Sequence, residues 1–255
     1  MASAVVLAGR ENTGKLKDIS GERWEALIPI AGAPMLQYVI DAVSEARQIE
    51  RVIIVGPEDA LRDRIKGRAI TYVPPQGGIV ANVRAAVQLL SPDEQVIIVT
   101  SDVPLITAQT VDGFLDECRA VGPADVYYPI LERRVLEARY PTTVRTYAKL
   151  REGTYTGGNF FVIKAGMIDA VGEIAEKFVA ARKSPLQMAG LLGWSFIIKL
   201  LLGRAALPEL VERAVRILGA PAQVVETQQA EIGIDVDKPS DFELVEAELA
   251  KRRLG

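Results

Sequence analysis

Short apolar runs alternate with segments of helical periodicity in the first half of the chain. The apolar runs are continuous rather than alternating in polarity, as in strands that are buried on both faces. They predict strands over 4–7, 52–55, 70–73, 96–100 and 126–128. The segments between them repeat apolar residues at helical spacing and predict helices over 35–46, 60–66, 80–90 and 110–121. Alternation of this kind indicates right-handed βαβ crossovers and a mostly parallel sheet, so the predicted fold class is α/β.

The second half of the chain has a different pattern. It predicts an extended segment over 140–150 and a short strand over 160–163. A helical insertion is expected near 164–219, because residues 168–218 follow a nearly continuous helical pattern. Breaks in that pattern are expected near Pro185, Gly193 and Pro208.

The chain closes with two further strand-like segments and a helix. The strand-like segments are 224–225 and 232–236, and Ser240 is positioned to cap a helix that runs to Leu254. No internal repeat, low-complexity tract or flexible linker is apparent in the sequence. We therefore expect a single domain.

The composition narrows the possible chemistry. Hydrophobic residues make up 49% and charged residues 25% of the sequence, a balance typical of folded proteins that excludes a wholly disordered chain. The net charge of −3 gives no general attraction to nucleic acid, so we expect no nucleic-acid partner, and any phosphate must be held by a local site. Histidine is absent and Cys118 is the single cysteine. Histidine acid–base catalysis, Ser-His-Asp hydrolysis, imidazole zinc sites and cysteine-rich metal clusters are therefore excluded, which leaves carboxylates, Lys, Arg and backbone amides.

Targeting signals are not evident. Residues 1–7 run directly into a strand pattern without the basic region of a signal peptide, so we expect none. The most apolar stretch, 191–202, contains Lys199 and is much shorter than the roughly 20 residues that cross a bilayer. We expect a cytoplasmic protein with no membrane span.

The loop after the first predicted strand is the first candidate site, because ligands bind at the carboxyl ends of strands in parallel sheets. It contains Gly9, Arg10, Gly14 and Lys15. Glycine lets backbone N–H groups approach a phosphate closely, and the basic side chains add positive charge. From this loop alone, a polar surface turn with two glycines is an equally good interpretation.

The loop after the strand predicted at 70–73 is the second candidate. Gly77 and Gly78 precede a helix, and Asn82 lies in its first turn. Backbone N–H groups at a helix N-terminus would contact an anion or a base. Taken alone, such a pair of glycines is more often a simple turn between a strand and a helix.

The loop after the strand predicted at 96–100 is the third candidate and the strongest. Ser101 and Asp102 follow the strand directly, and Pro104 ends it. Mg²⁺ prefers hard oxygen ligands, commonly one or two carboxylates together with substrate phosphates. The alternative is that Asp102 caps the next helix, but Thr107 is better placed to be that cap.

The closing segment supplies two more carboxylates. Asp235 and Asp237 lie one pleat repeat apart in the predicted strand 232–236 and its extension, and so would share a strand face. The alternative role of this segment is to begin the last helix, for which Pro239 and Asp241 are suitable residues. Both roles are compatible.

A further candidate group lies in the middle of the chain. Arg145 is followed by a Gly-Gly-Asn turn that includes Gly158 and Asn159. A guanidinium group binds phosphate in a bidentate manner, and the turn places bare backbone beside a polar side chain. A surface arginine without a role is equally plausible from the residues alone.

Together these segments resemble the MobA-like NTP transferase (nucleotidyltransferase) superfamily, which includes molybdenum-cofactor nucleotidyltransferases and methylerythritol-phosphate cytidylyltransferase. The resemblance extends over roughly 4–163 and 222–250 and rests on L-A-G at 7–9, A-L-I-P-I-A-G-A-P-M-L at 26–36, D-V-P at 102–104 and V-D-K-P at 236–239. It implies a three-layer α/β/α sandwich. It also implies one domain over 1–255, with a nucleotide-binding half at about 1–122 and an acceptor-binding half at about 123–255.

The resemblance also implies a role for each segment. Asp102 and Asp237 would hold Mg²⁺, with Asp235 in reserve. The catalytic residues would be Arg10, Lys15 and Asp102. The residues implied to bind the nucleotide are Leu7, Ala8, Gly9, Arg10, Gly14, Lys15, Gly77, Gly78, Asn82 and Ser101. The residues implied to bind the acceptor are Arg145, Gly158 and Asn159.

The sequence departs from the family pattern in the phosphate-binding region. Glu25 stands where the family has the lysine of P-K-x-L, and Ala33 where it has the lysine of G-K-P. A carboxylate at a triphosphate site would repel the ligand. Either another cation takes over, or Glu25 points elsewhere; the candidate cations are Arg10, Lys15, Lys17 and Arg23.

The activity implied is Mg²⁺-dependent transfer of a nucleoside monophosphate from an NTP to a phosphorylated small-molecule or cofactor acceptor, with release of pyrophosphate. The alternatives are a non-catalytic nucleotide-binding or regulatory protein and a glycosyltransferase on a similar sheet. The expected partners are the NTP, the acceptor and a second copy in a homodimer.

The helical insertion is the least explained region. Residues 194–202 are apolar nearly all round, which predicts burial in the core, at a dimer interface or against a lipidic substrate, and core packing is the preferred interpretation. The neighbouring Arg182 and Lys183 would either reach an acceptor phosphate or end a helix.

Overall fold

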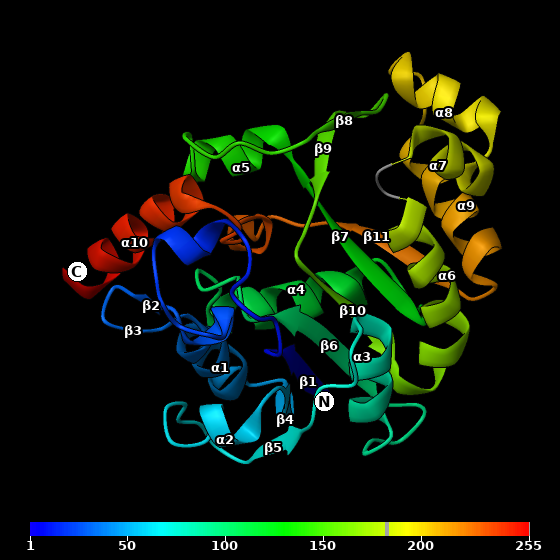
Figure 1. Ribbon diagram of the computed structural model, residues 1–255. Coiled ribbons are helices and arrows are strands. Elements are labelled where there is room, and N and C mark those ends of the chain that lie inside the picture. The colour runs from blue at the N-terminus through cyan, green and yellow to red at the C-terminus, as the bar shows by residue number, and fades with distance from the viewer. Residues whose placement is uncertain (182–183, 255) are drawn as a thin grey trace.

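The computed structural model of the chain describes residues 1–181 and 184–254. The strands, labelled in Figure 1, are β1 (Ala2–Leu7), β2 (Pro29–Ile30), β3 (Ala33–Pro34), β4 (Ile49–Val55), β5 (Ile70–Val73), β6 (Gln95–Thr100), β7 (Val126–Glu132), β8 (Ala148–Lys149), β9 (Thr154–Gly157), β10 (Phe160–Lys164) and β11 (Ala222–Glu226). The helices are α1 (Met35–Glu45), α2 (Glu58–Leu61), α3 (Ile79–Val87), α4 (Ala108–Ala120), α5 (Arg133–Arg139), α6 (Ile168–Ala181), α7 (Pro185–Leu192), α8 (Trp194–Leu201), α9 (Leu207–Leu218) and α10 (Pro239–Leu254).

The central sheet is parallel on one side and mixed on the other. Its order is β5-β4-β1-β6-β10-β7-β9-β8, and β11 also pairs with β7. The pairs among β5, β4, β1 and β6 are all parallel, as is the pair of β11 with β7. β10 is antiparallel to both β6 and β7. The predicted α/β class with a largely parallel sheet is confirmed, and the antiparallel strands belong to the second half of the chain.

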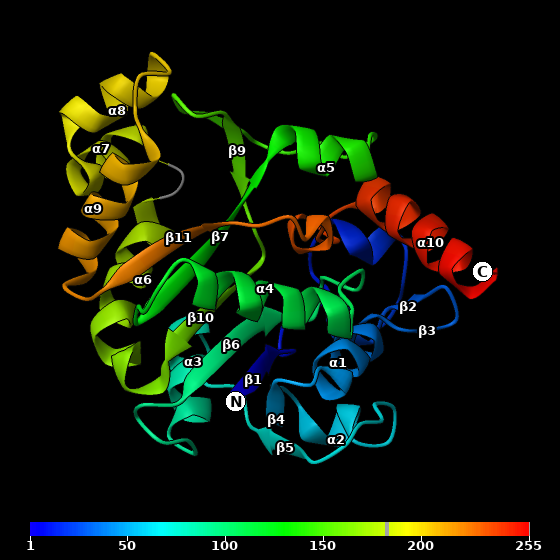
Figure 2. The same ribbon diagram turned by 180° about the vertical axis from the view of Figure 1, so that it is seen from behind.

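Helices cover both faces of this sheet (Figures 1 and 2). On one face, α1 and α4 pack against alternate strand residues such as Val6 and Ile54. On the other face, α3 and α6 pack against the residues between them, such as Val5 and Ile53. Successive side chains of a strand point to opposite faces, so both must be apolar when both are covered. This explains the continuous apolar runs, and the predicted three-layer sandwich is confirmed.

Helix α4 begins with a closed hydrogen-bonded cap. The Thr110 N–H donates to Thr107 Oγ1 over 3.2 Å, and the Thr107 N–H donates to Thr110 Oγ1 over 3.2 Å. The choice of Thr107 rather than Asp102 as the cap of this helix is therefore confirmed. Asp102 is left available for other contacts.

The helical pattern of the second half is confirmed as α6 to α9. Gly193, with φ of +86°, separates α7 from α8 because it adopts a backbone conformation that L side chains rarely take. Helix α6 completes one layer of the sandwich, and α9 packs beside it against β11. Helices α7 and α8 lie beyond the end of this layer (Figure 1). Arg182 and Lys183, with the role expected for them, lie outside the described residues.

The prediction that the apolar stretch 194–202 packs in the core is confirmed for only one face of α8. Phe196 is buried in a cluster with Ile130 and Tyr155. By contrast, Trp194 is 58% exposed and Leu201 is 81% exposed. The neighbouring segments therefore cover one face of α8 and leave large apolar side chains on its other face exposed.

The predicted strand at 232–236 is wrong. Residues Ala230–Gly233 form a 3₁₀ turn, and the chain then runs without strand pairing to α10. The Val236 N–H donates to the Asp102 carbonyl over 2.9 Å, an isolated bond and not a ladder. Apolar side chains here fill two cores on different sides, which produces a strand-like sequence without a strand neighbour.

Three further boundaries differ from those predicted. The helix expected over 60–66 is shortened to α2, and a tight turn follows in which the Ile65 N–H donates to the Leu61 carbonyl. The extended segment 140–150 is mostly irregular, because only β8 finds a partner, in β9. Helix α10 begins at Pro239, so Ser240 lies inside the first turn and does not cap it; the fixed φ of proline suits the first helical position.

Within residues 1–181 and 184–254, no helix combines the length and the apolar composition needed to cross a bilayer.

Replacing Thr107 by Ala tests the cap of α4. We expect Thr107→Ala to lower the free energy of unfolding by about 1 kcal/mol, because the Thr110 N–H loses its acceptor. Thr107→Ser is the matched control and should retain most of the stability. Urea denaturation of both variants measures the effect, and equal stability of Thr107→Ala and the wild type would contradict the assignment of this cap.

Candidate active site

The loops that follow β1, β4 and β6 meet at one edge of the sheet. The Ser101 N–H donates to the Leu7 carbonyl over 3.1 Å, and the Ala8 N–H donates to the Val55 carbonyl over 2.8 Å. A Cβ built on Gly9 would lie 3.2 Å from Pro75 Cβ, so the loop after β5 packs directly on the loop after β1. The predicted convergence of the Leu7–Gly9, Pro75 and Ser101 segments is therefore observed.

The long loop after β1 is fixed by a buried asparagine that the sequence analysis did not single out. Asn12 is 6% exposed, and its Nδ2 donates to the carbonyls of Ser20 and Glu22 over 2.9 and 3.1 Å. Its backbone N–H donates to the Arg23 carbonyl over 2.8 Å. These three bonds tie the outgoing and returning halves of the loop together. An asparagine in a polar loop gives no sequence signal that its amide will be buried.

Glu25, which replaces the family lysine, is buried and paired with Arg10. Its side chain is 4% exposed, and its Oε2 lies 3.1 Å from Arg10 Nε. The Glu25 N–H also donates to the Arg10 carbonyl over 3.0 Å. Burial raises the pKa of Glu25; the charge of Arg10 opposes this, whereas Asp102 and Asp237 add to it, and the pKa remains above its ordinary value. The carboxylate is thus turned toward a cation, which answers the question raised by the sign reversal.

Arg10 links the loop after β1 to the closing segment. Its side chain is 59% exposed, and its NH1 lies 3.3 Å from Asp237 Oδ1. Burial lowers the pKa of Arg10, but the charges of Glu25, Asp237 and Asp102 outweigh that effect and the pKa is raised overall. A guanidinium has five N–H donors, so these two partners leave donors for a further anion. Of the candidate substitute cations, Arg10 is the one held at this position by a buried carboxylate.

Asp102 lies near enough to Glu25, Asp235 and Asp237 for their charges to interact. It accepts a hydrogen bond from Thr100 Oγ1. Burial raises the pKa of Asp102 to about 6; the hydrogen bond from Thr100 opposes this, and the charges of Asp235 and Asp237 add to it. Mutual repulsion among carboxylates is the electrostatic condition that favours a bound cation.

The structure distinguishes the two candidates for the second carboxylate. Asp235 forms an ion pair with Arg145, and both side chains are largely buried. The Asp237 side chain is 55% exposed, and its contact with Arg10 is the 3.3 Å approach of Oδ1 to Arg10 NH1. Because the predicted strand is absent, the two residues do not share a strand face, and each has its own basic partner. Asp237 is the one that remains accessible.

The protein oxygen ligands at this position would fill only part of a Mg²⁺ coordination shell. Asp102 and Asp237 offer hard oxygen ligands, and the raised pKa of Asp102 reflects its carboxylate neighbours as well as its burial. In the part of the chain that the structure describes, no three acidic, histidine or cysteine side chains form a ready metal site. Mg²⁺ commonly takes one or two carboxylates and completes its shell with water and substrate phosphates. A metal here would therefore be expected to bind together with a phosphate ligand.

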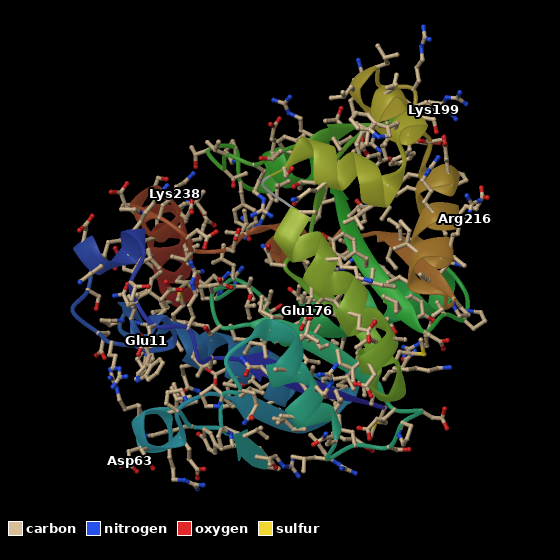
Figure 3. The ribbon with its side chains drawn as sticks, turned by 45° about the vertical axis from the view of Figure 1, so that its right-hand side comes forward. Glu11, Asp63, Glu176, Lys199, Arg216 and Lys238 are labelled. Carbon is tan, nitrogen blue, oxygen red and sulfur yellow. The ribbon has the colours of Figure 1, made fainter. Side chains whose placement is uncertain are left out.

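A cleft of about 640 Å³ opens beside these groups. Its residues come from the loop after β1, the segment before β8 and the start of α10, and they combine basic with acidic side chains. They are Arg10, Gly14, Lys15, Thr143, Val144, Arg145, Ile234, Asp235, Asp237, Lys238, Asp241 and Leu244. Figure 3 shows Lys238 projecting beside the start of the red helix, α10, next to the N-terminal segment. Lys238 and Thr143 were not among the predicted site residues, because nothing in their local sequence sets them apart.

The predicted acceptor residues have different structural roles. Arg145 lines the cleft, and its NH2 donates to the Gly157 carbonyl over 3.2 Å and to Asn159 Oδ1 over 3.4 Å. A Cβ on Gly158 would lie 2.5 Å from Ile232 Cγ2, so this glycine is required for packing. Asn159 orients Arg145, and its own Nδ2 is buried without a partner among the described residues.

The predicted base-binding loop lies outside this cleft. Gly77 has φ of +87°, which favours glycine, and the Gln76 N–H donates to Asn82 Oδ1 over 2.6 Å. Asn82 therefore shapes the turn. Helix α3 begins directly after Gly78 without a side-chain cap, so the first backbone N–H groups of the helix have no side-chain acceptor. Ser101 and Asp102 are likewise not part of the cleft lining.

Fold and site together define an α/β protein whose strand ends carry a basic loop and paired carboxylates beside an open cleft. A family model described as the MobA-like NTP transferase domain matches residues 4–197. The chain belongs to this family.

Individual relatives agree with this assignment at different levels. A solved structure described as a hypothetical transferase from Thermus thermophilus is 36% identical, covers 94% of this chain and 99% of its own, and superposes with a TM-score of 0.82. CMP:2-keto-3-deoxy-manno-octonic acid synthetase in complex with CTP is 15% identical, with coverages of 98% and 99% and a TM-score of 0.64, which shows a shared fold. The bifunctional protein GlmU of Sphingopyxis alaskensis is 35% identical over 121 residues, or 46% of this chain. The match spans only 26% of that GlmU protein.

The pKa of Asp102 leads to a prediction about stability. A carboxyl whose pKa rises from 3.8 to about 6 on folding binds its proton more tightly in the folded state, so its ionisation lowers stability as the pH rises through this range. We expect Asp102→Asn to raise the free energy of unfolding by roughly 1–3 kcal/mol near pH 8. The gain should fall toward zero below the unfolded-state pKa of 3.8.

Urea denaturation near pH 8 and at a pH below 3.8 measures this difference. Asp63→Asn is the matched control: Asp63 is exposed, and Figure 3 shows it at the lower end of the molecule, well away from Lys238. Its effect should stay within roughly 0.5 kcal/mol. If Asp102→Asn is less stable than the wild type near pH 8, the ionised Asp102 carboxylate does not destabilise the folded protein, and the prediction is wrong.

Proposed function

We propose that this chain is a Mg²⁺-dependent nucleotidyltransferase that moves a nucleoside monophosphate from an NTP to a phosphorylated small molecule and releases pyrophosphate. The family provides the NTP transferase fold. The observation that carries the proposal is the position of Arg10, held by buried Glu25 at the mouth of a cleft that also contains Asp237. The exposed edge of its guanidinium supplies the positive charge that the family's lysine would supply.

The basic residues of the cleft would bind the triphosphate. Arg10 and Lys15 come from the loop after β1, and Gly14 between them leaves room for the phosphates to approach the backbone. A guanidinium forms paired hydrogen bonds to phosphate oxygens. Such binding replaces the contact of Arg10 with Asp237, because both anions compete for the same N–H groups. Glu25 continues to hold the Nε side of the guanidinium.

Asp102 and Asp237 would hold the metal ion. Release of Asp237 from Arg10 frees a carboxylate at the moment when the phosphates that complete a Mg²⁺ shell arrive. Bound there, Mg²⁺ would neutralise charge on the phosphates and position them. Thr100 fixes the Asp102 carboxylate through its hydroxyl donor.

In the reaction, an oxygen of the acceptor phosphate attacks the α-phosphorus of the NTP. A new phosphorus–oxygen bond forms, the bond between the α-phosphorus and the oxygen that bridges to the β-phosphorus breaks, and pyrophosphate leaves with that oxygen and its electron pair. The acceptor phosphate is already anionic, so no general base is needed and the absence of histidine is no obstacle. Positioning and electrostatic stabilisation by Arg10 and Lys15 account for the catalysis.

The acceptor would occupy the far side of the cleft. Arg145 and Lys238 provide positive charge there, and Thr143 provides a hydroxyl group. Arg145 is paired with Asp235 and largely buried, whereas Lys238 is more exposed and lies 3.8 Å from its partner Asp241. This combination suits an acceptor that carries one phosphate and further hydroxyl or carboxyl groups. The CTP complex of a structural neighbour supports a search that begins with CTP.

Pyrophosphate release tests the proposal. CTP, UTP, GTP and ATP are each incubated with Mg²⁺ and a panel of sugar phosphates, polyol phosphates and phosphorylated sugar acids. We expect release with one NTP, dependent on both Mg²⁺ and one acceptor class. Asp102→Asn should lower the rate by roughly 10²–10³-fold, because the metal loses a charged ligand, whereas Asp63→Asn should leave it unchanged.

Two results would contradict the proposal. An unchanged rate in Asp102→Asn would remove Asp102 from the metal site. Tight NTP binding with no pyrophosphate release for any acceptor would favour the alternative of a nucleotide-binding regulatory protein on the same fold.

A further inference from the structure

Helix α8 presents a stripe of large apolar side chains to solvent. Trp194 is 58% exposed, Ile198 53%, Leu201 81% and Leu202 61%. These positions follow the i, i+4, i+7, i+8 spacing that places side chains on one face of a helix. Exposed apolar residues are common singly, but a contiguous stripe of four indicates a surface that binds something.

The inner face of α8 already packs against the protein, so the exposed stripe lies on the opposite face of the helix. Phe196 is buried, with Leu200 and Leu207 packed around it. The Arg213 guanidinium lies over the Phe196 ring, 4.7 Å from its centroid. The Arg213 NH1 also donates to the Leu192 carbonyl at the end of α7. The helix is thus anchored by one face while the other remains uncovered.

Basic side chains flank the stripe. Lys149, Arg151 and Arg204 are exposed, and none of them forms an ion pair with a described residue. Two of them contact the turn that follows α8, one through its side chain and one through its backbone. The Lys149 aliphatic chain lies over Gly203, where a Cβ would be 3.1 Å from Lys149 Cδ, and the Arg151 N–H donates to the Ala205 carbonyl over 2.9 Å.

Basic groups outnumber the acidic groups described beside the stripe, which are Glu152 and Glu209. Glu209 Oε1 accepts from Lys199 Nζ over 3.0 Å and lies 3.6 Å from Arg213 NH2. Glu152 accepts the Leu207 N–H over 3.1 Å at the start of α9. The rim of the stripe is therefore positive, although the chain as a whole carries a net charge of −3.

We propose that α8 docks this protein on an anionic lipid surface. Trp194 and the three aliphatic side chains would enter the boundary between headgroups and acyl chains, and the flanking cations would pair with anionic headgroups. A second copy joined by two-fold symmetry would bring the same positive rims together.

Docking through α8 would leave the catalytic cleft open. Figure 3 shows Lys199, on α8, and Lys238, which lines the cleft, on opposite sides of the molecule. Figure 1 shows the same separation between α8 and the start of α10. The proposal is therefore independent of the nucleotidyltransferase activity, and its test does not require turnover.

The test uses Trp194 as its own reporter. In Trp24→Phe protein, Trp194 is the remaining tryptophan of the sequence. We expect its emission to shift to the blue when vesicles of phosphatidylcholine with phosphatidylglycerol are added, and the protein to sediment with them. Binding to phosphatidylcholine alone should be roughly tenfold weaker or more, because the flanking Lys and Arg side chains then lose their anionic headgroup partners.

Substitutions then separate the apolar and the basic contributions. Leu201→Glu should abolish sedimentation with anionic vesicles, whereas Leu89→Glu, at a 51% exposed leucine after α3, should not. The double variant Lys149→Glu, Arg204→Glu should lose the preference for anionic lipid. Circular dichroism checks that each variant is folded, which the high exposure of Leu201 favours.

The proposal is overturned if folded wild-type protein does not bind anionic vesicles, or if Leu89→Glu reduces binding as much as Leu201→Glu. It is also overturned if light scattering shows a dimer that Leu201→Glu dissociates, because the stripe is then an interface between two copies.

Discussion

The rest of the site depends on the position of β1, which lies between two parallel neighbours in the sheet. Every residue from Ala2 to Val6 is buried, and Leu7 pairs in register with Val55 and Thr100. This pairing fixes three strand ends at one edge, so the chain must leave β1 and β6 side by side. A slip of one residue would turn every apolar side chain of β1 to the wrong face, and both cores resist it. The Arg10 loop and Asp102 are adjacent because of this constraint.

A short chain of charges then connects the two halves of the site. Buried Glu25 holds Arg10, and Arg10 reaches Asp237 in the closing segment. Val236 donates its N–H to the carbonyl of Asp102, which brings that segment to the end of β6. Glu25 is buried whereas Arg10 is more than half exposed, so loss of Arg10 would leave a buried carboxylate without its cation. We therefore expect Glu25 and Arg10 to vary together, and we propose that this pair takes the place of the family's lysine.

The sequence predicted the parallel half of the sheet well, because strands buried on both faces have a distinctive continuous apolar pattern. Thr107 was recognisable as a cap from its position before a helix. The segment 232–236 was misjudged because its apolar residues serve two different cores, and periodicity does not reveal which neighbour a side chain will meet. Likewise, an all-apolar helix such as α8 carries no signal of which face is covered.

Some of the candidate site residues were likewise predictable from the sequence, and others were not. Asp102 was recognisable as a candidate site residue because an apolar strand ends at Thr100, just before Ser101 and Asp102. The contact between Arg10 and Glu25 was not, because it depends on how the intervening loop folds back, and Asn12 controls that return through buried hydrogen bonds. The ion pair of Asp235 with Arg145, which is our reason for favouring Asp237 as the second carboxylate, joins residues that are distant in sequence and was not predictable.

We propose that Arg10, positioned by Glu25, binds the phosphates in place of the family's lysine. This role is tested by calorimetric titration of the preferred NTP with Mg²⁺ into the wild type, Arg10→Ala and the double variant Arg10→Ala, Glu25→Lys. Arg10→Ala should weaken binding by roughly 10–100-fold, and the double variant should recover much of that loss, because a lysine returns to the family position. Arg23→Ala, which removes an exposed cation paired with Glu11, is the matched control and should bind as the wild type does. Unchanged binding in Arg10→Ala, or a double variant no better than Arg10→Ala while both are folded, would contradict the account.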